Sequence, residues 1–149
     1  NAGGANNTIA EYLQSAFKEL GVDMEIDTQE WKVVSATQHT GDFQLTRFAW
    51  VYDYDEPLQL LNLFRSQDAN NYAHYSNKKY DKLMQTAMKE TNGKKRSKAL
   101  HKAEQMLLED LPMAPMVFSK ENYLIRPGIK GIQHLPSGHS YFMYCTKTE

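Results

Sequence analysis

Residues 50–57 carry the side chains best suited to bind a charged ligand, because aromatic and acidic residues alternate there. A carboxylate neutralises an ammonium group, and the face of an aromatic ring attracts it. This segment therefore suits an amine. Asp55 and Glu56 are explained equally well as caps of a helix beginning at Pro57, since negative charge is stabilising at a helix start. Asp53 lies farther from that helix and is the better binding candidate.

Arg47 is the second residue of interest, because it lies in a segment, residues 43–51, that is otherwise largely apolar. A buried guanidinium is costly unless it is paired, so Arg47 requires a nearby anion or a polar cleft. Two interpretations remain open from composition alone. One is an anionic ligand, and the other is a structural ion pair with Asp53, Asp55 or Glu56.

The sequence lacks the patterns typical of metal sites, nucleophilic catalysis and phosphate binding. The five histidines show no paired helical spacing with a glutamate, and the acidic residues lack the ligand series and central glycine of an EF-hand loop. No Gly-x-Ser-x-Gly elbow and no glycine-rich phosphate loop follows an expected strand. Cys145 is the single cysteine, which excludes an intrachain disulfide and a cysteine-rich zinc site. We therefore expect no catalytic residue, no metal and no cofactor.

Composition narrows the class of protein further. A chain of 149 residues allows one domain, and 41% hydrophobic with 23% charged residues is typical of a globular fold. The sequence holds no apolar run long enough for a membrane-spanning helix. Seventeen Lys and Arg against eighteen Asp and Glu give a net charge of -1, which argues against a nucleic-acid binder. No basic segment followed by an apolar one precedes the first expected helix, so we expect no secretory signal within these residues.

Hydrophobic periodicity predicts alternating helices and strands in the first third of the chain. A capping box at Thr8 and Glu11 predicts where the first helix begins, and Gly21 predicts where it ends. The strand at residues 43–51 is apolar on both faces, which predicts a place in the middle of a covered sheet. The order indicates an α/β layer arrangement: helix 9–20, strand 22–26, helix 29–39 and strand 43–51.

The remainder is predicted to be helical, then extended. Pro57 is expected to open a short helix, and residues 66–77 to form an ordered loop. Apolar spacing predicts two longer helices around residues 80–88 and 100–111, the first stopped by Asn92 and Gly93. Residues 113–125 are expected to be extended. A final strand at 141–144 is isolated by prolines and glycines, so we expect it to pair with something outside this chain.

Several motifs, ordered and spaced along most of the chain from about Thr8 onward, resemble the oligopeptide-binding proteins of ABC importers. They are residues 20–22, 29–32, 41–43, 50–57, 71–75, 80–81, 103–104 and 112–115. Members of that family are usually several times longer, so the resemblance covers only their C-terminal part. It implies an α/β fold, namely a lobe of a type 2 periplasmic-binding-protein-like fold with a mixed sheet flanked by helices. Residues 1–118 would form the C-terminal part of the peptide-binding lobe. Residues 119–149 would form the hinge crossing and the C-terminal strands that complete the other lobe.

The resemblance also implies a function: non-enzymatic binding of short peptides in a cleft between two lobes, for delivery to ABC permease subunits in the membrane. Family members are periplasmic or otherwise extracytoplasmic, and some are lipid-anchored. Two other readings stay open. The ligand could be a dipeptide, a murein peptide or a metal chelate, or the chain could be an isolated lobe that acts as an interaction module. In the second case it would self-associate through unpaired strands, because exposed edges recruit partners.

Site residues follow from the same resemblance, position by position. Asp53 matches the aspartate that pairs with the peptide α-ammonium group, and Arg47 matches an arginine that can meet a peptide carboxylate. The peptide-binding strand, whose backbone pairs with the ligand as in strand addition, is matched by Ala49, Trp50 and Val51. The side-chain pockets are matched by Trp31, Gln38 and His39, although Gln38 stands where a relative has arginine.

Overall fold

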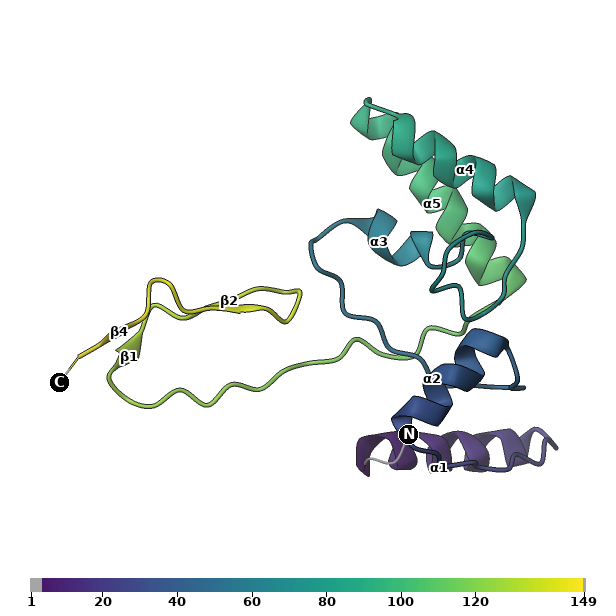
Figure 1. Ribbon diagram of the computed structural model, residues 1–149, viewed down its shortest axis with the longest axis horizontal. Coiled ribbons are helices and arrows are strands. Elements are labelled where there is room, and N and C mark those ends of the chain that lie inside the picture. Colours follow the sequence, from purple (N-terminus) through teal and green to yellow (C-terminus); the bar gives the residue numbers. More distant parts are fainter. Residues whose placement is uncertain (1–3, 149) are drawn as a thin grey trace. The chain divides into compact units, whose positions relative to one another are not determined.

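The structure is a computed structural model that describes residues 4–148 (Figure 1). It divides into two compact units, the first ending at Thr46 and the second beginning at Arg47. Within residues 4–148, no helix is long and apolar enough to cross a bilayer. The elements in chain order are α1 Gly4–Glu19, α2 Trp31–Thr40, α3 Pro57–Asn62, α4 Lys78–Lys89, α5 Gly93–Asp110, β1 Ile129–Lys130, β2 Gln133–His134, β3 Ser140–Tyr141 and β4 Thr146–Lys147.

The first helix of the first unit begins earlier than its sequence pattern predicts. Thr8 lies inside α1, and its hydroxyl donates to the Gly4 carbonyl at 3.1 Å, so the predicted capping box is wrong. A threonine hydroxyl can bond back to the carbonyl four residues earlier, which lets it sit within a helix instead of capping one. The predicted end is confirmed, since Gly21 follows the helix with a φ of 78°.

The second helix confirms its prediction to within two residues. Gly41 has a φ of 75°, and its N–H donates to the Thr37 carbonyl at 3.0 Å, which is a left-handed helix end that glycine adopts readily. The expected strand at residues 22–26 does not form. From α1, Gln14 Nε2 donates to the Met24 carbonyl at 2.7 Å. No strand of the described chain lies beside residues 22–26, and a segment with period-two apolar spacing forms a strand only when a neighbouring strand pairs with it.

Three helices build the core of the second unit, and their predicted existence is confirmed. Tyr80 and Met84 of α4 pack against Ala103 and Leu107 of α5, all of them buried. The Tyr80 hydroxyl donates to the Leu61 carbonyl at 2.6 Å, which ties α3 to this pair. The prediction that Asn92 stops the helix before it is wrong. Instead its side-chain oxygen accepts the Lys95 N–H at 3.2 Å and caps α5.

The loop at residues 66–77 is ordered by side-chain hydrogen bonds, as predicted. The Asn71 side chain donates to the Tyr75 carbonyl at 2.8 Å and accepts the Tyr75 N–H at 3.1 Å. The Ser66 hydroxyl donates to Asp81 Oδ2 at 2.7 Å, which fastens the loop to α4. Residues 71–75 and 80–81 therefore support the scaffold in this structure.

The tail folds back on itself as two short antiparallel pairs, β1 with β4 and β2 with β3. Only Tyr141 of the predicted strand at 141–144 is in a strand, and within the chain it pairs with Gln133. The reason is the tight turn between them. Gly138 adopts a φ of 82°, and its N–H donates to the Leu135 carbonyl at 3.0 Å. The described residues thus form two-stranded pairs and not the larger mixed sheet.

Candidate functional site

The segment that follows Arg47 is extended, but it forms no strand. Arg47 is exposed, and so are Leu45 (65%) and Val51 (68%), so the expectation of a buried arginine in a central strand is wrong for this chain. The physical reason is the absence of neighbours, because residues 47–53 lie outside every strand pairing that residues 4–148 make. The backbone of this segment is left as an open edge.

One face of the segment is held by an aromatic cluster. The Phe48 and Trp50 rings lie 5.7 Å apart between centroids, and Phe48 meets the Tyr72 ring edge-on at 5.2 Å. Residues two apart share a face of an extended chain, so the spacing of Phe48 and Trp50 already predicts that their rings lie on the same face. Sequence reasoning placed Trp50 in the site but missed Phe48 and Tyr72 as its supports. Ala49 and Val51 fall on the opposite face.

Asp53 lies where the extended segment turns toward α3. Its backbone N–H donates to Gln59 Oε1 at 2.7 Å, and the residue is exposed. A side chain from α3 therefore fixes the backbone at this position while the carboxylate faces solvent. An exposed carboxylate directly after an extended edge can meet the ammonium end of a ligand lying along that edge.

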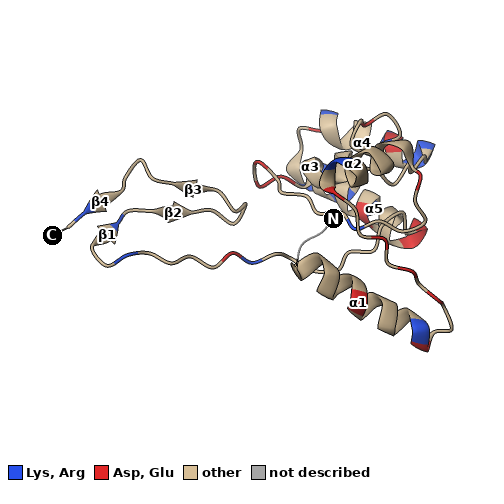
Figure 2. Ribbon diagram, turned by 60° about the horizontal axis from the view of Figure 1, so that its bottom comes forward, with Lys and Arg blue, Asp and Glu red and all other residues tan. Residues whose placement is uncertain are grey.

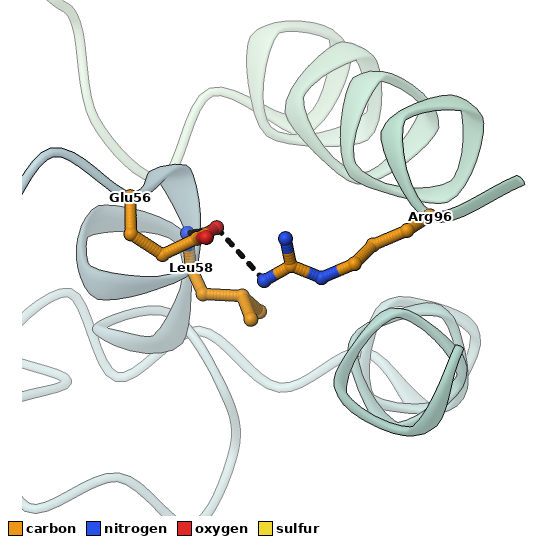
Figure 3. A network of polar contacts seen from close by, with 3 residues as sticks. All are labelled: Glu56, Leu58 and Arg96. Carbon is orange, nitrogen blue, oxygen red and sulfur yellow. Dashed lines mark hydrogen bonds and ion pairs between the residues drawn. The ribbon is translucent and has the colours of Figure 1, made fainter. Parts of the chain in front are cut away.

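The neighbouring Glu56 has a structural role. It caps α3, since Oε1 accepts the Leu58 N–H at 3.3 Å, and the same oxygen lies 2.9 Å from Arg96 Nη2 (Figure 3). The cap interpretation is confirmed for this residue. Glu56, one of the three acidic partners proposed for Arg47, is therefore paired with Arg96.

Three predicted site residues lie on α2, in the first unit. Trp31 is its first residue and is 59% exposed, whereas Gln38 is 1% exposed. These two are seven residues apart, about two helical turns, so they share one face of α2. Gln38 Nε2 donates to Thr46 Oγ1 at 3.0 Å, and His39 Nδ1 donates to the Ser35 carbonyl at 2.7 Å. The ligand-binding roles of all three stay predictions.

The chemistry available here is recognition. In the part of the chain that the structure describes, no group of three or more His, Cys, Asp or Glu side chains is placed to hold a metal. What the second unit offers is an open backbone edge, an aromatic support and an exposed carboxylate. These groups can bind a ligand through its backbone and its amine.

Comparison with known proteins finds chains of similar sequence. Residues 1–72 match the family model of bacterial extracellular solute-binding proteins, family 5 middle region. The chain is 33% identical to the oligopeptide-binding protein OppA of Bacillus subtilis (strain 168), over 95% of this chain and 26% of OppA. It is 38% identical to the periplasmic murein peptide-binding protein MppA of Escherichia coli (strain K12), over 76% of this chain and 21% of MppA.

The fold is also shared. The substrate-binding domain of an oligopeptide ABC transporter from Bacillus anthracis str. Ames superposes with a TM-score of 0.81 and 29% identity, over 96% of this chain and 29% of that one. The resemblance to a lobe of a type 2 periplasmic-binding-protein-like fold is thereby confirmed. The chain spans about a quarter of the length of the relatives that it matches. In sequence and fold, the chain is therefore similar to the bacterial extracellular solute-binding proteins of family 5.

Proposed function

We propose that this chain forms part of the cleft of a solute-binding protein that binds short peptides and delivers them to an ABC importer. The observation that carries the proposal is the open extended edge at residues 47–52, which leads directly to the exposed Asp53. The names of the relatives support it, since they are described as oligopeptide- and murein peptide-binding proteins. A protein that accepts many peptides must recognise what all peptides share, which is the backbone and the charged ends.

We assign three binding roles to residues of the second unit. Asp53 pairs with the peptide α-ammonium group through a charge-assisted hydrogen bond. The backbone of Ala49, Trp50 and Val51 pairs with the peptide backbone as an added strand, which leaves specificity to side-chain pockets. Arg47 meets a peptide carboxylate.

The pocket roles belong to α2. We propose that Trp31, Gln38 and His39 line side-chain pockets. The pockets tolerate different ligands, because ordered water can satisfy varied polar groups. Residues 119–149 act as the hinge crossing and as strands of the second lobe, and release follows hinge opening.

The proposal places the protein outside the cytoplasm, in the periplasm or held at the membrane by a lipid anchor. Its partners are short peptides and the permease subunits of the importer, and it binds no nucleic acid. It is not an enzyme and uses no cofactor, since its task is reversible binding. Hydrolysis of a peptide pool by the purified protein would contradict this part of the proposal.

Two other functions compete with this one. A murein peptide is favoured by the 38% identity with the murein peptide-binding protein, and a dipeptide or a metal chelate are further ligands within the family. Self-association as an interaction module is favoured by large exposed apolar side chains, among them Phe118 (98% exposed) and Leu124 (103% exposed). A molar mass that rises with concentration in light scattering would favour the interaction module.

The test is calorimetric titration of tri- to pentapeptides into the protein that carries this chain. Asp53→Asn removes the charge that meets the amine, so we expect affinity to fall by about 10- to 100-fold. Asp55→Asn is the matched control, since this aspartate is also exposed and lies two residues away. N-acetylated peptides should bind the unchanged protein about as weakly as free peptides bind the Asp53 variant. Equal affinity for Asp53→Asn would contradict the amine anchor.

A further inference from the structure

The helix pair α4–α5 concentrates positive charge. Residues 78–110 hold nine Lys and Arg against five Asp and Glu, a formal charge of +4 in a chain whose net charge is -1. One of the five acidic residues, Asp81, accepts hydrogen bonds from the Ser66 N–H and hydroxyl at 3.0 and 2.7 Å. Figure 2 shows the Lys and Arg positions on these helices in blue. The lysines outnumber any acidic partner of their own helices, so this surface favours an anionic partner.

A groove of about 300 Å³ lies between the two helices within this basic surface. The lining residues from α4 are spaced at positions i, i+3, i+4 and i+7, so they are neighbours on one face of the helix. Leu83 and Met106 are partly buried against the core and give the groove an apolar floor. The rim is basic and exposed, because it is formed by the lysines of both helices. The lining residues are Lys79, Lys82, Leu83, Thr86, Lys102 and Met106.

We propose that this groove docks an acidic amphipathic segment of a partner protein. One apolar side chain of the partner would cover Leu83 and Met106, and flanking carboxylates would meet Lys79, Lys82 and Lys102. Such a pairing follows the rule for helix-in-groove recognition, in which apolar anchors give affinity and charges fix the register.

Two other occupants fit less well. A small ligand is normally enclosed over most of its surface, and this groove is partly open to solvent. A flat anionic membrane surface would meet the lysines but would leave the recessed apolar floor uncovered. None of the groove residues is among the residues assigned to peptide binding, so the inference does not depend on the peptide-binding proposal.

The test uses a blocked helical peptide as the probe, with leucines at i and i+4 flanked by glutamates. Acetyl and amide ends keep it from being held by its termini. Binding to the protein that carries this chain is measured by fluorescence anisotropy. The double variant Lys82→Glu with Lys102→Glu should weaken binding by about tenfold or more, because it opposes the carboxylates of the probe. The double variant Lys18→Glu with Lys32→Glu makes the same change at exposed lysines of the first unit and should bind unchanged.

The outcomes separate the alternatives. Loss of affinity when the glutamates of the probe become glutamines supports the proposal, provided that thermal melts show the variants folded. Unchanged affinity in the Lys82 and Lys102 variant overturns it, and so does failure of the acidic probe to bind. Loss of probe binding on Asp53→Asn overturns it in favour of the peptide site. Binding of phosphatidylglycerol vesicles, but not of the acidic probe, overturns it in favour of a membrane surface.

Discussion

At the scale of single residues, the acidic groups of the second unit differ in their contacts. Glu56 holds Arg96 and caps α3, while Asp53 stays exposed beside an open edge. Asp110, like Glu56, contacts other side chains of this unit. Its Oδ2 accepts the Tyr75 hydroxyl at 2.5 Å and Asn77 Nδ2 at 2.9 Å, and these hydrogen bonds lower the pKa of Asp110.

The same contact predicts how stability depends on alkaline pH. Burial, and then the hydrogen bond to Asp110, raises the pKa of Tyr75 from its usual 10.0 to about 12. Between these two values the unfolded chain loses the Tyr75 proton and the folded chain keeps it. Stability from this group is therefore complete below pH 10 and is lost as the pH rises through about 12.

Tyr75→Phe should make the fall in stability between about pH 10 and 12 shallower, as measured by urea denaturation at a series of pH values. Some fall should remain, because burial also raises the pKa of Tyr80. Tyr54→Phe, at an exposed tyrosine, is the control and should leave the pH profile unchanged. The same slope in the Tyr75 variant and the unchanged chain would show that Tyr75 does not couple to folding.

At the scale of elements, the β1–β4 pair depends on backbone approaches that only glycine permits. Gly131 has a φ of 83°, and a Cβ there would collide with the carbonyl oxygen of Tyr144. Gly128, at a φ of 86°, would place a Cβ 2.8 Å from the Thr148 carbonyl oxygen. Both glycines lie beside the β1–β4 pair.

Gly131→Ala should therefore open the β1–β4 pair. The left-handed φ alone costs an alanine roughly 1–2 kcal/mol, and the collision with Tyr144 adds to it. The measurement is amide hydrogen exchange at Thr148, whose N–H donates to the Gly128 carbonyl at 2.8 Å. Gly93→Ala is the control, since a Cβ there meets nothing within 4 Å, and its exchange should match the unchanged chain. Full protection of the Thr148 amide in the Gly131 variant would contradict the prediction.

Elements also show how far sequence patterns reach. The helices were predictable because their signals are local: apolar spacing around Tyr80 and Leu107, Pro57 at a helix start and Gly41 at a helix end. The patterns at residues 22–26 and 43–51 predicted strands that do not form, because a strand depends on a neighbour that sequence periodicity does not supply. Trp50 and Asp53 could be proposed from residue type and position. The contact between the Phe48 and Tyr72 rings could not, because it depends on the folded loop.

At the scale of the whole molecule, the candidate site is exposed rather than enclosed. Trp50 is 39% exposed and Val51 is 68% exposed, and residues 47–53 lie outside the strand pairings of the described chain. A site for a small ligand usually surrounds most of the ligand surface. The side chains named here provide an anchor and an edge, and the cleft that we propose needs a second wall.

We therefore expect the 149-residue chain on its own to bind tri- to pentapeptides weakly or not at all. Ordering a short peptide costs free energy. A single exposed edge with one carboxylate offsets little of this cost, because water competes for every contact. Calorimetric titration of the chain, in parallel with the longer protein that we propose contains it, measures the difference. A dissociation constant of about 1 μM or tighter for the chain alone, which is roughly -8 kcal/mol, would contradict this expectation. That result would mean that the edge at residues 47–53 is a complete site, and that the second wall contributes to release rather than to affinity.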